Sequence, residues 1–527
     1  MFRLFKLYSI FFLLFNIKAL YSQVNQEWKF RYGGDEFDSG NSIVTDNSGN
    51  VYIAGSSNFD IITMKYSKSG QQLWLSRYNG PANGSDGAFS IKIDNEGNLI
   101  VTGESVGIGT GVDYTIIKYN TFGVQHWVSR YSTTGNRRDA AYSTAIDNSN
   151  NIFVTGESAN DIGGKDYLTI KYNSSGNELW IVKYNQGNNS SNKAFAITCD
   201  IQENIYVTGV SDGDFATVKY NSSGVQQWVA RYNGDINDND AGKAIAVDAL
   251  GNVYVSGSSV GAMFYYDYAT VKYNSSGIEQ WVRRYNGTSN FQDQLRSMII
   301  DEKGNVYVTG NGTEIGEGYN FVTIKYNKDG DTVWKSSYHN GSNDIAFASA
   351  LDKFGNVYIT GESDGNGTGE DYATVKYDST GNQLWVMRYD YSGQYGDYPS
   401  SITLDKIGSV FVTGQSDRDI LTIKYSQLTG TSSIFSEIPT QYSLSQNYPN
   451  PFNPKTILNY QCAIYNDVSL KVFDVLGNEV ASLINEKQNA GSYSVEFDGS
   501  GFASGIYFYS LITDGVIIDT KRMILLK

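Results

Sequence analysis

The side chains best placed to bind a ligand are aspartates that recur at two positions of a repeated segment. One set lies five residues before the lysine of a Lys-Tyr pair and comprises Asp60, Asp113, Asp166, Asp214, Asp267, Asp371 and Asp419, with Asn320 in the remaining copy. The other lies eight residues before the end of an apolar run and comprises Asp38, Asp86, Asp139, Asp240, Asp293, Asp344 and Asp397, with Asn192 in the remaining copy. Two such rings of carboxylates could hold Ca²⁺, which takes several oxygen ligands, or a polyhydroxyl ligand. Alternatively, each aspartate caps a turn or pairs with a nearby arginine or lysine, because a residue present in every repeat is most simply a folding requirement.

Other candidates for catalysis are sparse. The two histidines, His126 and His339, are far apart, which argues against a histidine-based triad or a histidine-rich metal site. The segment 235–240 resembles a calcium loop only faintly because it lacks the glycine at the sixth position. Three glutamates begin long connections in the form Gly-Glu-Ser: Glu104, Glu157 and Glu362. A pair of them could serve acid–base chemistry, although spacing alone does not bring two together.

The elements that carry these residues repeat about every fifty positions. All eight tryptophans occupy one place in the repeat: Trp28, Trp74, Trp127, Trp180, Trp228, Trp281, Trp334 and Trp385. One unit contains strand-like segments at 243–248, 251–257, 267–273 and 277–285, each rich in β-branched or aromatic residues and bounded by turn residues. Four short strands in such a period predict a blade of a β-propeller, and we expect the tryptophans to be structural wedges between blades.

The order of the strands predicts how the ring closes. A fourth-strand segment stands alone at 28–32, before any first strand, whereas the last unit, 401–425, ends after its third strand. The N-terminal strand can therefore complete the last blade, which hides sheet edges. The prediction is an all-β chain with an eight-bladed propeller over residues 23–426, in which the last blade is closed by the N-terminal strand.

The lengths of the connections distinguish the two faces of this ring. The offset from the final aspartate of each first strand to the closing glycine of the second strand is always nine positions, and the third-to-fourth connection is equally constant. Those final aspartates read as turn formers: Asp46, Asp94, Asp147, Asp200, Asp248, Asp301, Asp352 and Asp405. The second-to-third and fourth-to-first connections vary in length. Because strands alternate in direction, the varying loops share one face, where we expect the ligand to bind.

Composition excludes some partners. The net charge of −15 argues against nucleic acid and against an anionic membrane surface. Cys199 and Cys462 are too few and too far apart for a disulfide framework. Residues 1–22 have the basic start, apolar centre and small residues of a signal peptide. No later stretch is long and apolar enough to predict a transmembrane segment.

The repeat resembles the bacterial β-propeller repeat called SBBP. The resemblance rests on Val-Thr-Gly, Asp-Tyr-x-Thr-x-Lys-Tyr and Ser-Ser-Gly-x-x-x-Trp, seen at 207–228 and 255–281, and it implies the fold but no fixed activity. The Gly224-to-Trp228 step also resembles the tryptophan-docking motif of quinoprotein propellers. Those often carry adjacent cysteines at the quinone, and this chain has none.

The last 85 residues differ in character. Three prolines in 447–454, the segment 503–509 and the basic apolar end at 521–527 closely resemble a type A sorting domain of the type IX secretion system. Strand and turn signals predict a small immunoglobulin-like β-sandwich over 443–527, joined by a linker at 427–442. The resemblance implies contact with the outer-membrane secretion machinery and with a sortase-like peptidase, and export to the outer surface or surroundings of a Gram-negative bacterium.

These observations predict an exported, monomeric binding or adhesion module with a glycan or protein ligand on the varying face. No cofactor is expected, and Ca²⁺ is the candidate ion. The alternative is an exported enzyme on the same scaffold, either a carbohydrate-active hydrolase or lyase or a quinoprotein-like oxidoreductase.

Overall fold

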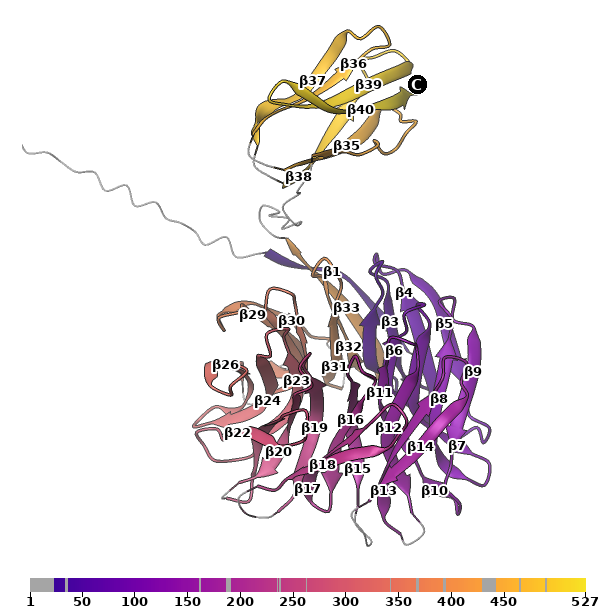
Figure 1. Ribbon diagram of the computed structural model, residues 1–527, viewed down its shortest axis with the longest axis vertical. Helices are drawn as coiled ribbons and strands as arrows, with labels where there is room; N and C mark the ends of the chain where they lie inside the picture. Colours follow the sequence, from indigo (N-terminus) through magenta and orange to yellow (C-terminus); the bar gives the residue numbers. More distant parts are fainter. Residues whose placement is uncertain are drawn as a thin grey trace, which may run out of the picture. The chain divides into compact units, whose positions relative to one another are not determined.

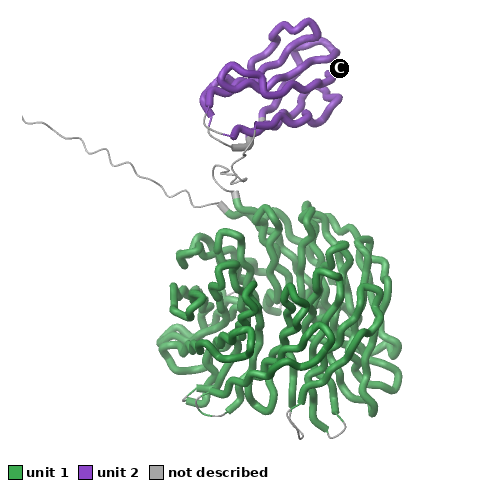
Figure 2. The backbone as a smooth tube through the Cα atoms, in the orientation of Figure 1, with its two compact units in different colours: residues 1–428 green, residues 429–527 purple. Residues whose placement is uncertain are grey.

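The computed structural model divides the chain into two compact units, residues 1–428 and 429–527 (Figure 2). The structure describes residues 23–33, 37–160, 163–185, 191–234, 236, 238–261, 263–341, 343–365, 369–391, 395–428, 442–463, 466–488 and 491–527. The predicted signal peptide and most of the predicted linker lie outside these residues. Every element within them is a β-strand, and none is a helix able to cross a membrane.

The described residues of the first unit form eight antiparallel sheets of four principal strands (Figure 1). The first three are β2–β5 (Ser39–Thr45, Val51–Ser57, Asp60–Tyr66, Gln72–Tyr78), β6–β9 (Asp86–Ile93, Leu99–Gly107, Gly111–Tyr119, Gln125–Tyr131) and β11–β14 (Ala140–Ile146, Ile152–Ala159, Lys165–Tyr172, Glu178–Tyr184). A two-residue strand, β10 (Arg137–Arg138), adds to β8 in parallel.

The next four sheets repeat the pattern. They are β15–β18 (Lys193–Cys199, Ile205–Ser211, Asp214–Tyr220, Gln226–Tyr232), β19–β22 (Asp240–Val247, Val253–Val260, Tyr266–Tyr273, Glu279–Tyr285), β23–β26 (Gln294–Ile300, Val306–Glu314, Gly318–Tyr326, Thr332–Tyr338) and β27–β30 (Asp344–Leu351, Val357–Gly365, Gly369–Tyr377, Gln383–Tyr389). The prediction of an all-β chain built from repeated four-stranded sheets is confirmed.

The eighth sheet, which we call the closing sheet, joins the two ends of the unit. It contains β31 (Asp397–Leu404), β32 (Val410–Ser416), β33 (Asp419–Leu428) and β1 (Gln23–Tyr32). β1 pairs antiparallel with β33, and Trp28 lies opposite Lys424, as the order of the strands predicts. In Figure 1 the indigo β1 runs beside the orange β33. The first unit is thus fastened by hydrogen bonds between segments almost 400 residues apart.

The eight sheets follow one another in a closed circle of contacts. The first strand of each sheet contacts the first strand of the next, and β31 contacts β2. Eight clusters of buried apolar residues each lie between two neighbouring sheets, including one between the closing sheet and β2–β5. Each sheet therefore buries both faces, which explains why its second and third strands are almost continuously apolar.

The constant connections have a local cause. In the turn after β27, Asp352 Oδ1 accepts the backbone N–H groups of Phe354 and Asn356, each at 2.9 Å, and Oδ2 accepts the side-chain amide of Asn356 at 2.7 Å. The other final aspartates of first strands accept hydrogen bonds in the same way. An inserted residue would break this pattern, because the carboxylate reaches only its own turn.

The second unit has two sheets around one core. One contains β34 (Ser443–Leu444), β35 (Lys455–Cys462) and β38 (Gly491–Asp498); the other contains β36 (Asn466–Phe473), β37 (Glu479–Gln488), β39 (Gly505–Thr513) and β40 (Val516–Leu525). Apolar side chains from both sheets form a single cluster that includes Leu458, Cys462, Leu470, Tyr509 and Leu525. Alternating buried positions along β35 and β36 supply it.

Candidate functional site

The aspartates at the start of the third strands form ion pairs within their own sheets. Six of them bind the arginine of the adjacent fourth strand at 2.7–3.0 Å, in the pairs Asp60–Arg77, Asp113–Arg130, Asp214–Arg231, Asp267–Arg284, Asp371–Arg388 and Asp419–Arg31. Asp166 instead accepts amide hydrogens from Asn160 and Asn185, at 2.9 and 2.6 Å.

The arginines in turn link neighbouring sheets. Arg284 donates to the hydroxyl of Tyr232 in the preceding sheet at 2.9 Å, and Arg130 donates to Tyr78 in the same manner at 3.0 Å. The Asp–Arg pairs therefore help to hold the ring together, which is the structural alternative that the sequence left open.

The aspartates before or at the start of the first strands are buried and accept backbone hydrogens. Asp240 accepts the N–H of Gly234 at 2.5 Å and the N–H of Val260 at 3.0 Å, so it ties two loops of neighbouring connections together. Asp38, Asp86, Asp139, Asp293, Asp344 and Asp397 accept backbone hydrogens in the same loops. At the eighth position, Asn192 lies equally deep and donates to the carbonyl of Lys165.

The two predicted rings meet in pairs where neighbouring sheets join. A Cβ added to Gly33 would lie 2.1 Å from Asp419 Oδ1 and 2.7 Å from Asp38 Oδ2, so both carboxylates face this glycine. The charge of Asp267 likewise contributes to raising the pKa of Asp293. We call each such pair, together with the residue between its members, a junction. The two asparagines belong to two different junctions. By position in the repeat, Asn192 corresponds to the partner of Asp166, and Asn320 and Asp344 both contact His339.

The tryptophans dock on the following sheet. Seven of them donate their Nε1–H to a carbonyl in the next third-to-fourth turn, at Lys68, Thr121, Ser174, Ser222, Ser275, Lys328 or Ser379. A Cβ on Gly277 would lie 2.7 Å from the Trp228 ring, and φ there is +79°, so glycine is required. Trp385 differs: its Nε1 is buried without a hydrogen-bond partner among the described residues.

A site that the sequence analysis missed lies on the first strands, which are innermost. Each first strand carries a β-bulge, an extra residue that has no partner on the second strand. The extra residues are Asn41, Phe89, Tyr142, Phe195, Lys243, Arg296, Phe347 and Ser400, which we call the bulge ring. All eight are half-buried or exposed, although the residue before each is buried between sheets. Bulges commonly redirect a side chain in this way.

Neighbouring members of the bulge ring touch each other. Tyr142 contacts Phe89 and Phe195, with ring centroids 5.5 and 6.1 Å apart. The Lys243 ammonium lies 3.6 Å from the Phe195 ring centroid, and the Arg296 guanidinium lies 5.7 Å from that of Phe347. The bulge ring thus combines an aromatic arc with two adjacent cations.

The electrostatics of this arc are unusual for an acidic protein. Desolvation by the surrounding protein, together with the charges of Arg296 and Lys193, lowers the pKa of Lys243 to about 8. Three cations thus act on one another at one side of the ring, in a chain whose net charge is −15. An anionic ligand would relieve this repulsion.

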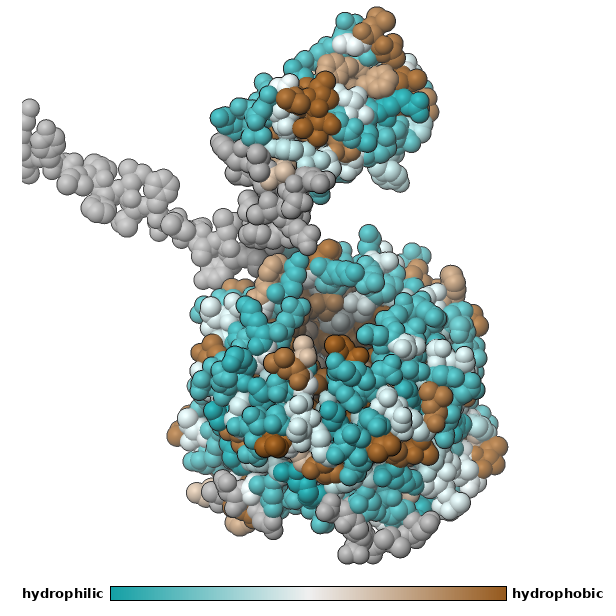
Figure 3. All heavy atoms as spheres, viewed as in Figure 1, coloured by the Kyte–Doolittle hydropathy of each residue, from teal (hydrophilic) through white to brown (hydrophobic). Residues whose placement is uncertain are grey.

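A cavity of about 440 Å³ opens beside these cations. Its lining includes Lys193, Phe195, Asp212, Lys243 and Tyr266, so it lies between β15 and β19 and the varying loops of their sheets. Figure 3 shows a mostly hydrophilic surface on the first unit, with a hollow in its middle and hydrophobic side chains at the margin. The cavity lies on the face where the loop lengths predict binding.

The glutamates of the long connections lie next to the bulge ring. Arg138 bridges Glu104, at 2.5 Å, and Glu157. Glu157 is fully buried and also pairs with Lys165 at 2.5 Å, and these cations hold its pKa below the ordinary value despite its burial. Burial, by contrast, raises the pKa of Glu104. Lys193 lies 3.4 Å from Glu157 as a third cation. The first two glutamates thus converge on Arg138, but Glu157 is paired with three cations.

Glu362 has a different environment. Burial and the neighbouring charge of Glu370 raise its pKa to about 7, while Arg296 of the bulge ring acts in the opposite direction. It therefore exchanges protons near neutral pH, unlike Glu157.

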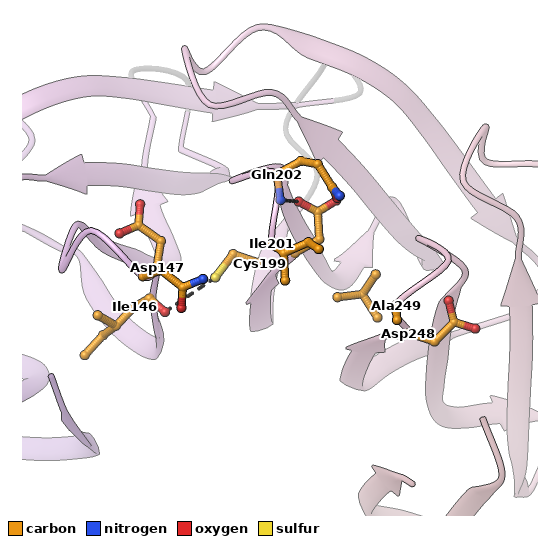
Figure 4. A pocket seen from close by; sticks show the side chains of 10 residues that line it. Ile146, Asp147, Cys199, Ile201, Gln202, Asp248 and Ala249 are labelled. Carbon is orange, nitrogen blue, oxygen red and sulfur yellow. Dashed lines mark hydrogen bonds between the residues drawn. The ribbon is translucent and has the colours of Figure 1, made fainter. Parts of the chain in front are cut away.

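The other end of the ring holds a second cavity, of about 330 Å³, where the first strands end (Figure 4). Asp147, Cys199, Asp200 and Asp248 line it, and the aspartates are the turn formers already described. Burial raises the pKa of the Cys199 thiol to about 11, and the thiol donates to the carbonyl of Ile146 at 3.6 Å. Both Cys199 and Cys462 are free. This end therefore presents turn residues and an inert thiol.

The remaining sequence candidates lie outside the bulge ring. His339 contacts Asn320 at 2.8 Å in its junction. Asp235 and Asn237 of the faint calcium loop lie outside the described residues, and Asp240 of that loop serves as a backbone acceptor.

In the second unit, the proline-rich segment contacts the strands that end the chain. Asn447 N–H donates to the Tyr509 hydroxyl at 2.7 Å, and that hydroxyl donates to the carbonyl of Ser445 at 2.7 Å. Phe452 exchanges backbone hydrogen bonds with Ile524 and Leu526. The three motifs of the sequence resemblance are thus parts of one packed structure.

Family models match both parts of the chain. The model described as a beta-propeller repeat matches residues 28–62, 227–264 and 280–317. The model described as a secretion system C-terminal sorting domain matches residues 446–525. Both resemblances drawn from the sequence are confirmed. No curated protein matches the chain.

Solved structures show only distant likeness. A fungal alcohol oxidase in complex with copper is 12% identical, covers 83% of this chain and 96% of its own, and gives a TM-score of 0.39. The Pan2 WD40 domain of Neurospora crassa is 7% identical, with coverage of 77% and 96% and a TM-score of 0.41. A protein of unknown function from Bacteroides caccae is 12% identical, with coverage of 58% and 94% and a TM-score of 0.33.

Scores this low carry no conclusion about activity, so the family models and the strand pairing identify the chain. It carries β-propeller repeats of the SBBP type and a C-terminal sorting domain, and type IX secretion exports it to the cell surface or the extracellular space.

Proposed function

We propose that the first unit is an eight-bladed β-propeller that works as an exported, monomeric binding module, with an acidic glycan as the ligand of its bulge ring. The second unit would be an immunoglobulin-like sandwich that engages the outer-membrane secretion machinery and is then removed by a sortase-like peptidase. The closed circle of sheet contacts supports the first part, and the single apolar core between two sheets supports the second.

One observation carries the binding proposal: the side chains of the bulge ring differ in chemistry from sheet to sheet, although the sheets are otherwise similar. The paired aspartates, the docking tryptophans and the turn aspartates recur in nearly every sheet and have partners there. The bulge ring instead places an amide, aromatic rings, two cations and a hydroxyl at one structural position. Folding alone does not require such variety, whereas recognition of an asymmetric ligand does.

The chemistry of the ring favours a carboxylated sugar chain. Aromatic faces such as Phe89, Tyr142 and Phe195 can pack against the apolar faces of sugar rings. Arg296 and Lys243 can then hold carboxylates through charge-assisted hydrogen bonds, which are stronger than neutral ones.

The test is a titration of the full-length chain with oligogalacturonate, followed by calorimetry. The wild-type protein should bind it and should bind the neutral galactose oligomer at least tenfold more weakly. Lys243→Ala and Arg296→Ala should each reduce the affinity about tenfold or more, which corresponds to about 1.4 kcal/mol. Raising the ionic strength should weaken the binding, because partly exposed charges are screened.

The matched control is Lys406→Ala, which removes an exposed lysine from a constant turn at the other end of the ring. It should leave the affinity unchanged. Equal losses in Lys406→Ala and Lys243→Ala, or equal affinity for the acidic and neutral oligomers, would contradict the proposal.

A second candidate function is glycoside cleavage, which one observation favours. Glu362, with a pKa of about 7, could donate a proton near neutral pH, and the carboxylate of Glu370 is one of the neighbouring charges that raise this pKa. Release of reducing ends from oligogalacturonate, abolished in Glu362→Gln, would establish this activity. Binding without any release of reducing ends would exclude it for this substrate.

The role of the second unit is tested by deletion of residues 443–527. The shortened chain should accumulate in the periplasm, while the full chain reaches the surface or the medium. Normal surface display of the shortened chain would contradict the assignment of this unit to export.

A further inference from the structure

The junction between β27–β30 and the closing sheet differs from the other seven in one residue. The position after the last tyrosine of each fourth strand lies between the paired residues of a junction. It is occupied by Gly33, Asn79, Ser132, Asn185, Asn233, Asn286, His339 or Asp390. Asn185 donates a hydrogen bond to Asp166 at 2.6 Å, and His339 lies 2.8 Å from Asn320 and 3.5 Å from Asp344. At the junction with the closing sheet, the carboxylate of Asp390 stands where the side chain of Asn185 or His339 stands in other junctions.

The three carboxylates at this junction converge. Oxygens of Asp371, Asp390 and Asp397 all lie within 4.8 Å of one another, and within the described parts of the chain no other group of three metal-ligating side chains does so. Oxygen ligands of Ca²⁺ lie about 2.3–2.6 Å from the ion, so opposite ligands are about 5 Å apart. The spacing therefore fits one ion between the three side chains.

The charges also fit. Arg388 binds Asp371 at 2.7 Å and neutralises one of the three carboxylates. A divalent cation would balance the other two.

A second observation points to a ligand at this place. Asp397 is 1% exposed, and its Oδ2 accepts the N–H of Tyr391 at 2.8 Å. Its Oδ1 is buried and has no hydrogen-bond partner among the residues that the structure describes, although the side chain of Ser416 lies near this carboxylate. A buried carboxylate oxygen without a donor is costly, and a bound cation would satisfy it.

The location gives the ion a structural role. Seven tryptophans donate Nε1–H to the third-to-fourth turn of the following sheet. Trp385 faces the closing sheet and has no such partner among the described residues. The closing sheet lacks this turn because its third and fourth strands, β33 and β1, come from opposite ends of the unit. This interface therefore lacks a hydrogen bond that the other interfaces have. Asp371 belongs to β29 and Asp397 to β31, so an ion held between them would span the same interface.

We propose that Asp371, Asp390 and Asp397 bind one calcium ion, which fastens the closing sheet to its neighbour. The ligands come from both sheets and from the connection between them, and water completes the coordination. The proposal does not depend on the ligand of the bulge ring.

The test uses the full-length chain stripped of metal with EGTA. Calorimetry with CaCl₂ should give one site per chain, and saturating Ca²⁺ should raise the melting temperature by about 5 °C. Asp390→Asn should bind no calcium and show no such rise. The variant should fold, because asparagine occupies this position in four other junctions, and in EGTA it should be at least as stable as the wild type.

The reverse substitution sharpens the test. Asn286→Asp places a third carboxylate beside Asp267 and Asp293 and should add a second calcium site. The proposal is overturned if Ca²⁺ leaves the wild-type melting temperature unchanged, or if Asp390→Asn keeps the full response. A response to MgCl₂ equal to that to CaCl₂ would overturn the choice of ion.

Discussion

The junction aspartates and the bulge ring lie a few residues apart on or beside the same eight strands, yet they are built in opposite ways. In β19, Asp240 is buried and accepts two backbone hydrogens, and nearly every sheet has its equivalent. Lys243, three residues later, is exposed, and the seven equivalent positions carry different side chains.

This contrast between the junction aspartates and the bulge ring distinguishes residues that stabilise the fold from residues that are available to bind a ligand. An aspartate whose oxygens all serve backbone donors has little capacity left for a ligand. A bulged residue has no partner on the next strand, so its side chain can change without disturbing the sheet. In this chain, repetition marks structure, and variation at a fixed place marks the candidate site.

The largest effect should come from changing these two positions of β19 in turn. Asp240→Ala leaves two backbone donors unpaired and should lower the free energy of unfolding by about 3 kcal/mol. Lys243→Ala should change it by less than about 0.5 kcal/mol. Urea denaturation of the full-length chain measures both. Asp240→Asn keeps one acceptor oxygen for the two backbone donors, so its loss should be smaller than that of Asp240→Ala. Equal losses in the two alanine variants would abolish the distinction.

A smaller effect concerns pH. Burial raises the pKa of Asp293 from 3.8 to about 6. The folded protein then binds this proton more tightly than the unfolded chain does, so the contribution of Asp293 to stability falls as the pH rises from about 4 to about 6. Asp293→Asn should therefore increase the free energy of unfolding by about 2 kcal/mol at pH 7 and by almost nothing below pH 4.

The control for this pH dependence is Asp378→Asn, because Asp378 lies in an exposed turn. Slight burial acts to raise the pKa of Asp378, but hydrogen bonds from Thr380 and Asn382 outweigh it and lower the pKa to about 2. It should leave the slope between pH 4 and 6 unaltered. The same slope in Asp293→Asn and in the wild type would show that the buried carboxylate is not responsible.

The smallest effect compares two tryptophans. Trp228 donates to Ser275 at 3.1 Å, whereas Trp385 Nε1 has no partner among the described residues. Trp228→Phe should cost about 1 kcal/mol more than Trp385→Phe, the usual net value of one hydrogen bond. Denaturation midpoints of the two variants measure this, and a larger loss at Trp385 would contradict the docking interpretation.

Much of the scaffold could be predicted from the sequence because its causes are local. The turn beginning at Asp352 uses only its own residues, so a constant spacing reveals it. The pairing of β1 with β33 followed from counting strands, since a lone fourth strand and a missing one can satisfy each other.

The junctions and the bulge ring could not be predicted because they depend on neighbouring strands. Every copy has the same number of residues between its first and second strands, so this spacing gives no sign of the extra residue in the first strand. Only the hydrogen-bond register between the two strands reveals it. The two aspartate sets were expected as separate rings, and only the packing of adjacent sheets brings Asp371 next to Asp397. One signal was available: the side chain five residues before each turn aspartate varies widely, as Phe195, Lys243 and Arg296 illustrate.

The claim that ligands bind at the bulge ring is tested most directly by hydrogen exchange of the full-length chain with and without bound oligogalacturonate. The account predicts that protection concentrates in peptides from β15, β19 and β23, around Phe195, Lys243 and Arg296. Protection confined to the constant turns at the opposite end of the ring, or to residues 443–527, would contradict it.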